Sequence, residues 1–456
     1  MNILHYSLGL PPYRTGGLTK YSFDLMKEQV SSKDNIFLLF PGKMGFINKD
    51  TRIKYFKEQN QIEVYELINP LPVPLLNGVC EPKYFMKPCD KLIFREFLID
   101  NKINILHIHT LMGLHKELLE ACHELGIKIV YTTHDYFGIC TKVNFVDHKG
   151  DLCKERNLEK CLKCNKLGYS MKTITILQSP IYRFLKNSGV TPKLKTLAQK
   201  LKGKKKIISN YTDAEIKVSD EYRKSYNDLL SYYNDMFNYI NLFLFNSNIA
   251  KIIYEKYIKC NGEVISITHG DIKDNRKLKN FNHDKLKLTY LGPNKKYKGF
   301  DLLIDTMKEL NKEYKSNIEL NLYGDRNELC IDTNIKFHGR YSYEQLSNIF
   351  DNTDLLVVPS IWNETFGFIV LEGLSYGVPV LVTDKVGSKD LIDNNEFKKG
   401  IVVNGDFIEL RNSIIRAIED RKILISLNKN IINDKLKFNI SNHTKDIELI
   451  YEEAVE

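Results

Sequence analysis

Residues 354–376 read DLLVVPSIWNETFGFIVLEGLSY, and this pattern predicts a strand, a loop and a helix in succession. The continuous apolar run at Leu355–Pro359 is typical of a strand that is buried on both faces of a parallel sheet. Glu364 follows in the loop at the carboxyl end of that strand, where ligands bind in open α/β sheets. Glu372 comes eight residues later, one to two turns into the helix. Spacing alone leaves an alternative open, namely a capping acid and a solvated glutamate.

Two further features surround this stretch. Phe366 and Gly367 stand at the start of the predicted helix, where free N–H groups and the helix dipole suit an anion. Lys298 stands in an earlier turn, between a strand at Leu286–Leu291 and a helix that begins after Gly299. A fixed ammonium group there can neutralise the charge that develops on a departing diphosphate. Taken alone, Lys298 could equally be an ordinary loop lysine.

Two turns in the first half of the chain repeat this placement. Gly16 and Gly17 follow a strand at Asn2–Leu8, and glycines let backbone N–H groups approach a phosphate closely. His134 follows a strand at Ile127–Thr132, although a structural histidine is the default interpretation there. All four turns lie at the carboxyl ends of strands, two in each half, so two facing domains would bring them to one cleft.

Strands alternate with helices in both halves, which predicts two doubly wound parallel sheets in an α/β fold. A chain of 456 residues fits two domains of about 200 residues each. We expect a first domain over residues 1–270, carrying an insertion at about 139–240, and a second domain over residues 285–440. The polar segment 271–284 is the predicted linker. A helix at 441–456 is predicted to cross back to the first domain.

The chain, with these turns in this order along it, resembles family 4 of the glycosyltransferases, a retaining group with the GT-B fold. The resemblance covers nearly the whole chain. The matching pieces are Gly16-Gly17-Leu18, His134-Asp135, Asn241–Ser247, His269-Gly270, Gly292–Gly299, Gly324-Asp325, Phe337-His338-Gly339 and Glu364–Gly373. The resemblance implies two Rossmann-like domains that face a central cleft.

It also implies roles for the nucleotide-sugar donor. Glu372 would hold the ribose hydroxyls, Glu364 would hold hydroxyls of the transferred sugar, and Lys298 would bind the diphosphate. Backbone N–H groups of Gly17, Phe366 and Gly367 would assist Lys298, with Gly16 in the same turn. His134 would contact the donor sugar near the reacting carbon.

Enzymes of this kind show no obvious enzymic nucleophile, and the leaving phosphate oxygen helps to deprotonate the acceptor on the same face. We therefore expect catalysis without a metal or another cofactor, through positioning and electrostatics.

The sequence departs from the family pattern in two places. Pro293 stands where the family usually carries arginine, so Lys295 or Lys296 is expected to supply the second positive charge. Arg340, directly after the Phe337-His338-Gly339 motif, is a further candidate donor-binding residue. Residues 387–390 read Gly-Ser-Lys-Asp in place of the usual Gly-Gly-x-x-Glu, which leaves the identity of the sugar open.

The expected reaction moves a hexose or N-acetylhexosamine from a UDP- or GDP-sugar to a glycan or lipid-linked acceptor, in the assembly of a surface polysaccharide or glycolipid. Two alternatives stay open at this point. One is a non-catalytic GT-B subunit that binds sugar nucleotides, and the other is a GT-B sugar-nucleotide epimerase.

Nine cysteines, an odd number in a long chain, argue against a disulfide framework. Four of them cluster at Cys140, Cys153, Cys161 and Cys164. Cys161 and Cys164 form a C-x2-C knuckle, and four thiolates could close a tetrahedral structural zinc site. Reduced buried thiols and a redox role are the alternatives.

The net charge of +9 is concentrated in one segment. Residues 165–212 hold eleven lysines and arginines and no acidic residue, a local charge of +11. This predicts binding to an anionic membrane surface, with an anionic acceptor or a merely solvated surface as alternatives. No nucleic-acid module accompanies the charge, so no nucleic acid is expected. Because we find neither a signal peptide nor a long apolar run, we expect a cytoplasmic protein, peripheral on the inner face of the cytoplasmic membrane.

Overall fold

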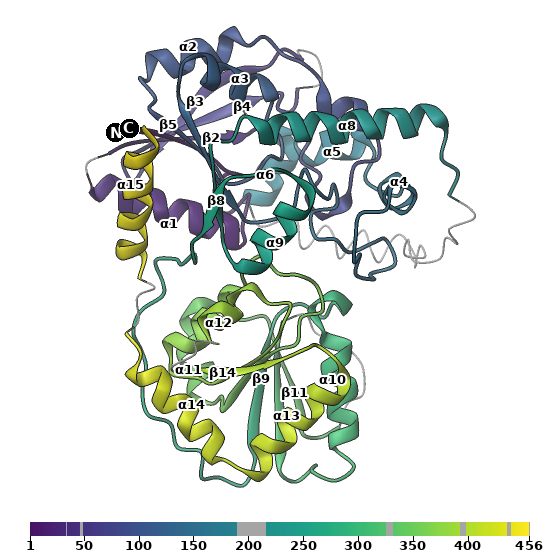
Figure 1. The fold of residues 1–456 in the computed structure, drawn as a ribbon, viewed down its shortest axis with the longest axis vertical. Coiled ribbons are helices and arrows are strands. Elements are labelled where there is room, and N and C mark those ends of the chain that lie inside the picture. The colour runs from purple at the N-terminus through teal and green to yellow at the C-terminus, as the bar shows by residue number, and fades with distance from the viewer. Residues whose placement is uncertain are drawn as a thin grey trace. The chain divides into compact units, whose positions relative to one another are not determined.

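The computed structural model describes residues 1–32, 34–45, 49–188, 216–324, 332–392, 398–435 and 439–455. The chain forms two compact units (Figure 1). Unit 1 comprises Met1–Phe245, Ile252–Ile265 and Ile440–Glu456, and unit 2 comprises Asn246–Lys251 and Ser266–Asn439. Each unit is built around its own sheet, so the two-domain α/β prediction is confirmed.

The sheet of unit 1 has the strand order β3-β4-β2-β1-β5-β6-β7-β8. Its strands are β1 (Asn2–Tyr6), β2 (Asn35–Pro41), β3 (Arg52–Gln59), β4 (Ile62–Ile68), β5 (Ile105–Ile108), β6 (Lys128–Thr133), β7 (Leu242–Phe245) and β8 (Gly262–Val264). All pairs are parallel except β3 with β4. Tyr6, at the end of β1, stands opposite Ile108, at the end of β5. The segments that follow these strands therefore emerge at one edge of the sheet.

The helices of unit 1 outside the predicted insertion are α1 (Gly17–Ser31), α2 (Leu92–Asp100), α3 (Lys116–Glu124) and α15 (Ile440–Val455), together with short 3₁₀ helices at Leu75–Asn77 and Pro82–Met86. Helix α9 (Asn248–Tyr257) begins in unit 2 and continues in unit 1 from Ile252 onward. The last helix, α15, lies beside the first, α1 (Figure 1). The Tyr21 hydroxyl pairs with His443 Nε2 at 2.8 Å, and Gln29 Nε2 donates to the Tyr451 hydroxyl at 3.5 Å. These buried polar contacts join the two ends of the chain within unit 1.

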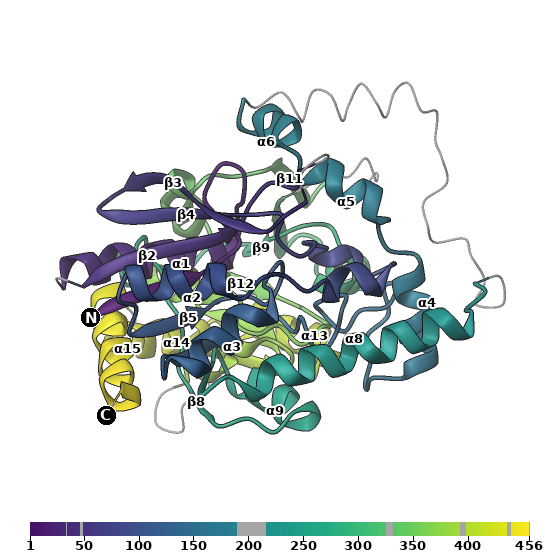
Figure 2. The same ribbon diagram turned by 90° about the horizontal axis from the view of Figure 1, so that it is seen from above.

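The described part of the predicted insertion is mostly helical. It contains α4 (Leu158–Lys166), α5 (Met171–Leu177), α6 (Pro180–Asn187) and α8 (Asp220–Asn238), of which α8 is the longest (Figure 2). Leu162 of α4 packs with Tyr222 and Tyr226 of α8 in a small apolar cluster. Residues 189–215, and with them seven of the eleven basic residues of the predicted patch, lie outside the described residues.

The sheet of unit 2 is parallel throughout, in the order β11-β10-β9-β12-β13-β14. Its strands are β9 (Leu286–Leu291), β10 (Ile318–Tyr323), β11 (Ile335–Gly339), β12 (Leu355–Val358), β13 (Val380–Thr383) and β14 (Gly400–Val403). Its helices are α10 (Phe300–Leu310), α11 (Leu346–Asp351), α12 (Phe368–Ser375), α13 (Phe407–Glu419) and α14 (Lys422–Asn433), with 3₁₀ helices at Lys296–Lys298, Tyr343–Gln345 and Gly387–Leu391. The central strands β9 and β12 are buried, as expected for apolar runs covered on both faces.

The segment 271–284 has no helix or strand, yet it packs along unit 2. The backbone N–H of Asn275 donates to the carbonyl of Ser375 at 2.9 Å, and Lys279 Nζ donates to the carbonyl of Phe350 at 2.7 Å. Phe281 is buried in the core of this unit. The boundary between the units therefore falls before this segment, at Ile265.

Candidate functional site

Glu364 lies in the loop between β12 and α12, and neighbouring backbone holds this loop in place. The N–H of Glu364 donates to the carbonyl of Lys385 at 2.9 Å, and the N–H of Gly387 donates to the carbonyl of Glu364 at 3.1 Å. The Glu364 carboxylate accepts hydrogen bonds from Lys298 Nζ at 2.8 Å and from Trp362 Nε1 at 3.2 Å. Its side chain is only 7% exposed, against 27% for Lys298. The structure thus brings together two predicted residues that are 66 positions apart in the sequence.

Lys298 reaches this position because Gly299 permits a tight turn. Gly299 has a φ of +74°, and a Cβ at this residue would stand 1.7 Å from the carbonyl oxygen of Pro359. The turn between β9 and α10 therefore lies directly against the end of β12. The carbonyl of Tyr297 then accepts the N–H groups of Ile361 and Trp362, and Lys298 Nζ stands 5.0 Å from the centroid of the Trp362 ring.

A cavity of about 160 Å³ opens at this point of unit 2. It is lined by Gly292, Pro293, Lys298, Glu364, Gly367 and Phe368, among other residues. Pockets for whole drug-sized ligands usually measure about 300–1,000 Å³. This cavity therefore has room for one part of such a ligand, next to a lysine and a carboxylate.

The first turn of α12 faces the cavity. Gly367, the N-cap residue, has a φ of +100°, and no side chain caps the helix. A Cβ on Gly367 would lie 3.1 Å from Glu364 Oε2, in a left-handed conformation that favours glycine. The Ser388 hydroxyl donates to the carbonyl of Gly367 at 3.0 Å, and the Ser388 N–H donates to the carbonyl of Phe366 at 2.8 Å. The Gly-Ser-Lys-Asp segment at residues 387–390, which differs from the family pattern, therefore supports this turn.

Glu372 lies in α12 and is largely buried, with its Oε1 atom 3.3 Å from His269 Nε2. The His269 Nδ1 atom accepts the N–H of Asp271, so a neutral ring carries its proton on Nε2, which lies near the carboxylate without a hydrogen bond to it. Burial, and then the negative charge of Glu372, raises the pKa of the Tyr343 hydroxyl. His269 also packs edge-on against Phe368, with ring centroids 5.1 Å apart. Glu372 is therefore held in one place by the side chains of His269 and Tyr343.

Trp362, His269 and Tyr343 were not predicted from the sequence to take part in the site. His269 belongs to a motif that matched the family, and Trp362 stands two residues before Glu364, so both positions carried a usable signal. Lys295 and Arg340, which were candidates, are exposed, and neither lines the cavity. Pro293 does line it, and its carbonyl accepts the Tyr290 hydroxyl at 2.8 Å.

In unit 1, His134 ends a chain of three hydrogen-bonded imidazoles. His5 Nε2 faces Gln29 Oε1 at 2.8 Å, His5 Nδ1 faces His109 Nε2 at 3.0 Å, and His109 Nδ1 faces His134 Nε2 at 3.3 Å. Because Gln29 Oε1 can only accept a hydrogen bond, each ring must carry its proton on Nε2. This chain of hydrogen bonds, the imidazole relay, leaves His134 Nδ1 without a proton, so that this nitrogen can accept a hydrogen bond.

Burial controls the charge of this cluster. It lowers the pKa of both His5 and His134 to about 3, so these rings are neutral at pH 7. Burial raises the pKa of the neighbouring Asp135 carboxyl to about 6. His134 can therefore serve as a neutral hydrogen-bonding group rather than as a cation.

Gly16 and Gly17 open α1 in unit 1, as predicted. Gly16 has a φ of +122°, and a Cβ there would meet no atom within 4 Å. No side chain caps the helix, and both glycines are exposed. The first N–H groups of α1 are accessible to an anion.

Residues 271–435 match the family model of group 1 glycosyl transferases. An uncharacterized 41.2 kDa protein in the cps region of Klebsiella pneumoniae is 27% identical over 141 residues, which are 31% of this chain and 38% of that protein. An uncharacterized glycosyltransferase of Methanocaldococcus jannaschii is 26% identical over 159 residues, 34% of this chain and 45% of that protein. The matches thus span less than half the length of these curated relatives.

Among solved structures, the protein HepE of Anabaena in complex with UDP matches with a TM-score of 0.59 and 13% identity, covering 99% of this chain and all of that chain. Together with the two parallel-dominated sheets, this likeness shows the GT-B fold.

Proposed function

We propose that the protein is a retaining glycosyltransferase that moves a hexose or N-acetylhexosamine from a UDP- or GDP-sugar to a glycan or lipid-linked acceptor. The observation that carries the proposal is the Lys298–Glu364 pair at the cavity of unit 2, beside the uncapped start of α12. The pair lies within the segment that matches the group 1 glycosyl transferases. A solved structure of the same fold holds UDP, which supports a nucleotide donor.

The residues of unit 2 divide the donor among them in this proposal. Glu372, fixed beside His269 and Tyr343, binds the ribose hydroxyls. Backbone N–H groups of Phe366 and Gly367 bind the diphosphate, to which the positive end of α12 is attractive. Glu364 accepts hydroxyl groups of the transferred sugar.

Lys298 has the electrostatic role. The bond between the anomeric carbon and the phosphate oxygen breaks, and a bond to the acceptor oxygen forms on the same face. The leaving phosphate oxygen takes the proton of the acceptor hydroxyl, so the reaction needs no separate base. The ammonium group of Lys298 stabilises the charge that grows on the diphosphate.

His134 has a separate role in the proposal. With its neutral ring and its fixed acceptor nitrogen, it binds a hydroxyl group of the donor sugar.

Positive charge from Lys298 and from the helix start makes a divalent cation unnecessary for the reaction. We therefore expect transfer to proceed in EDTA at an undiminished rate. Loss of activity in EDTA that magnesium or manganese restores would contradict this part of the proposal.

The acceptor side of the proposal rests on charge and exposed apolar residues. The basic segment from residue 165 onward fits an anionic membrane surface or a lipid diphosphate. Among the described residues, every helix is too short or too polar to traverse a bilayer. We propose a peripheral association with the inner face of the cytoplasmic membrane.

The experiment that tests the function is a thermal-shift panel of UDP-, GDP- and ADP-sugars, followed by a transfer assay with the best donor. A ligand that binds the folded state raises Tm by an amount that grows with the logarithm of its concentration over Kd. We expect one nucleotide series to stabilise the protein and the product to keep the anomeric configuration of the donor. An inverted product in NMR, release of an epimerised sugar without acceptor, or binding without any turnover would each overturn the proposal.

A further inference from the structure

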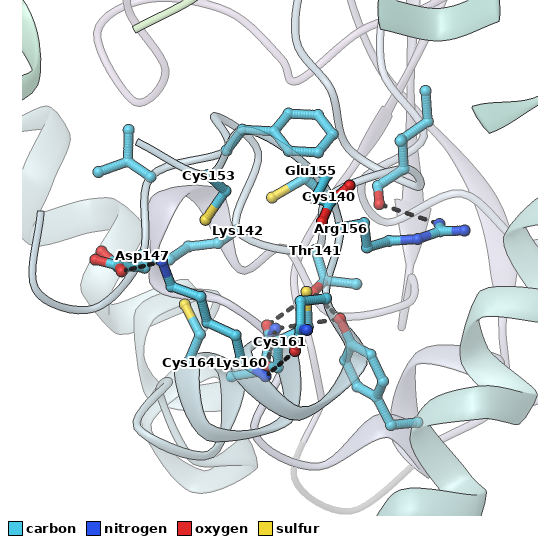
Figure 3. Close-up of a pocket in the computed structure, with 16 residues that line it drawn as sticks. Cys140, Thr141, Lys142, Asp147, Cys153, Glu155, Arg156, Lys160, Cys161 and Cys164 are labelled. Carbon is cyan, nitrogen blue, oxygen red and sulfur yellow. Dashed lines mark hydrogen bonds and ion pairs between the residues drawn. The ribbon is translucent and has the colours of Figure 1, made fainter. Parts of the chain in front are cut away.

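Four cysteines of unit 1 stand around one small cavity, apart from the residues of the proposed donor site (Figure 3). Cys140 follows β6, Cys153 lies in the next loop, and Cys161 and Cys164 belong to α4. Each of them is a free thiol rather than half of a disulfide. The cavity measures about 20 Å³, and a water molecule needs roughly 10–15 Å³ by the same measure. It can therefore hold a single ion but no organic ligand.

The backbone after Cys140 is shaped around its sulfur atom. N–H groups of Phe145, Lys142 and Val143 are directed at the sulfur. Val143 and Phe145 both have positive φ values, of 79° and 50°. Such a conformation is costly for a β-branched or aromatic residue. Hydrogen-bond donors around the sulfur are contacts that a metal-bound cysteine receives, and an ordinary buried thiol does not require three of them.

The other cysteines are held by regular structure. The N–H of Cys153 donates to the carbonyl of Phe145 at 2.7 Å, which ties its loop to the Cys140 turn. Asn157 caps α4 through the N–H of Lys160, and the N–H of Cys161 donates to the carbonyl of Asn157 at 2.8 Å. Cys161 and Cys164 are three residues apart on this helix and therefore share a face.

Cations around the cavity partly offset the charge of a tetrathiolate site. A divalent ion with four thiolates carries a net charge of about −2. Lys142, Arg156 and Lys160 line the cavity, together with the acids Asp147 and Glu155. Lys160 is paired with Asp147 at 2.8 Å. The charged groups of the lining therefore leave an excess of one positive charge beside the four sulfur atoms.

We propose that Cys140, Cys153, Cys161 and Cys164 bind one structural zinc ion. Four S–H bonds break, four Zn–S bonds form, four protons leave to solvent, and nothing is oxidised or reduced. Among the described residues, no three of these sulfur atoms lie mutually within 4.8 Å, so coordination would draw the side chains inward. With four protein ligands the ion has no open position, and its role is structural rather than catalytic. It would fasten α4 to the turn that begins six residues after His134.

In the described part of unit 1, two groups of possible ligand atoms do lie within 4.8 Å of one another. One is Cys89 with His115 and Glu117, and the other is His5 with His107 and His109. In the second group the rings already hydrogen-bond one another, Thr132 and Tyr451. In the first group His115 Nδ1 and Glu117 Oε2 have no hydrogen-bond partner. The Cys89 group offers three mixed ligands, whereas the four-cysteine cavity offers a complete thiolate set, so the experiment separates these two.

The test is the zinc content of the full-length protein, purified without added metal and measured by mass spectrometry of the metal. We expect one zinc per chain, lost in the double variant Cys161→Ser/Cys164→Ser. The matched controls Cys89→Ser and Cys122→Ser should keep it, since Cys122 is a buried thiol that belongs to none of these groups of ligand atoms. No zinc in the parent protein, zinc retained by the double variant, or zinc lost in Cys89→Ser would each overturn the proposal.

A second measurement uses the parent protein, in case the double variant does not fold. X-ray absorption at the zinc edge should give four sulfur ligands at about 2.3 Å. Titration with a mercurial should release the zinc as four of the nine thiols react. A shell of nitrogen and oxygen ligands would overturn the four-cysteine assignment. Neither result depends on transferase activity, so the zinc site stands or falls separately from the proposed function.

Discussion

At the scale of single residues, Lys298 and Glu364 hold each other in place before any donor arrives. Lys298→Ala should lower the transfer rate by about 100-fold or more, since it removes charge stabilisation from the leaving diphosphate. It should also lower Tm by a few degrees, because it leaves the nearly buried Glu364 carboxylate without its cation. Rate and melting temperature measured together separate these two effects.

Glu364→Gln and Lys308→Ala complete this test. The glutamine keeps the volume and can still accept the Trp362 N–H, so it should fold normally and transfer slowly. Lys308 is an exposed lysine of α10 in the same unit and should tolerate alanine in both measurements. A near-normal rate for Lys298→Ala would remove this residue from the site.

Gln29 sets the direction of the imidazole relay that ends at His134. Gln29→Leu removes the acceptor of the His5 Nε2 proton, so His134 should change from one tautomer to a mixture of two. We expect kcat/KM to fall by about tenfold, because a contact to the sugar loses its orientation. NMR of ¹⁵N-labelled histidine reads the tautomer directly.

A purely structural role for Gln29 would leave the His134 tautomer unchanged while stability fell, which would contradict the relay. His123→Ala, an exposed substitution on α3, is the control for general effects on unit 1.

Sequence patterns located Glu364, Glu372 and Lys298 because each follows a readable strand. They did not give the pairing of Lys298 with Glu364, which arises from a left-handed Gly299 against Pro359. Trp362 and His269 were missed for a similar reason. Their roles depend on the direction of side chains rather than on spacing along the chain.

At the scale of elements, α6 presents apolar side chains to solvent. Ile181 is 69% exposed and Phe184 is 72% exposed, while Arg183 of the same helix turns inward to Glu66 at 2.8 Å. Helices of this kind, with a polar and an apolar face, can lie in a membrane interface. The basic segment continues directly from α6, although residues 189–215 lie outside the described residues.

We therefore predict that Ile181→Glu/Phe184→Glu weakens binding to vesicles that contain anionic lipid by about tenfold or more, since it removes buried apolar area and adds negative charge. Vesicle co-sedimentation measures this, and added salt should weaken the binding of the parent protein. Ile252→Glu, at an exposed position on α9, is the matched control. Equal binding of parent and double variant, or equal binding to neutral vesicles, would refute docking through α6.

The strand predicted from the continuous apolar run at Leu355–Pro359 is confirmed nearly to the residue, since β12 spans Leu355–Val358. The β3–β4 pair was missed because β3 is an edge strand with mostly exposed, charged side chains, which leave no core-facing pattern. Helical spacing predicts a helix over 113–125, yet α3 begins only at Lys116. Gly113 has a φ of +79°, and a Cβ there would stand 2.6 Å from the Pro41 side chain, so this residue forms a close turn instead.

At the scale of the whole molecule, neutral buried histidines are concentrated in unit 1. Burial lowers the pKa of six of them, to about 3 for His5 and His134 and to about 4 for His115 and His443, with His107 and His109 also shifted down. In the described part of unit 2, His338 alone shows such a shift. A sequence cannot show this distribution, because it depends on which side of a sheet each ring is buried.

The sign of the pH effect follows from these shifts. Below about pH 6.5 the unfolded chain binds protons that the folded unit excludes, so stability falls as the pH falls toward the folded pKa values. Each such histidine costs about 1.4 kcal/mol between pH 7.5 and 5.5. Asp135 acts in the opposite direction, because its raised pKa of about 6 lets the folded state bind a proton there. Glu117 and Glu448, whose pKa burial also raises, act in the same direction as Asp135. Three carboxyls do not offset six histidines.

Unit 1 should therefore unfold at lower urea concentration at pH 5.5 than at pH 7.5, and unit 2 should change less. The single tryptophan, Trp362, lies in unit 2, so its fluorescence reports that unit, whereas circular dichroism reports both. We expect the two probes to separate as the pH falls, with the dichroism transition moving first. His5→Gln should reduce the pH dependence of that transition, because a glutamine does not titrate. Parallel shifts of both probes would show that acid acts on the two units alike, and that the buried histidines of unit 1 do not control its stability.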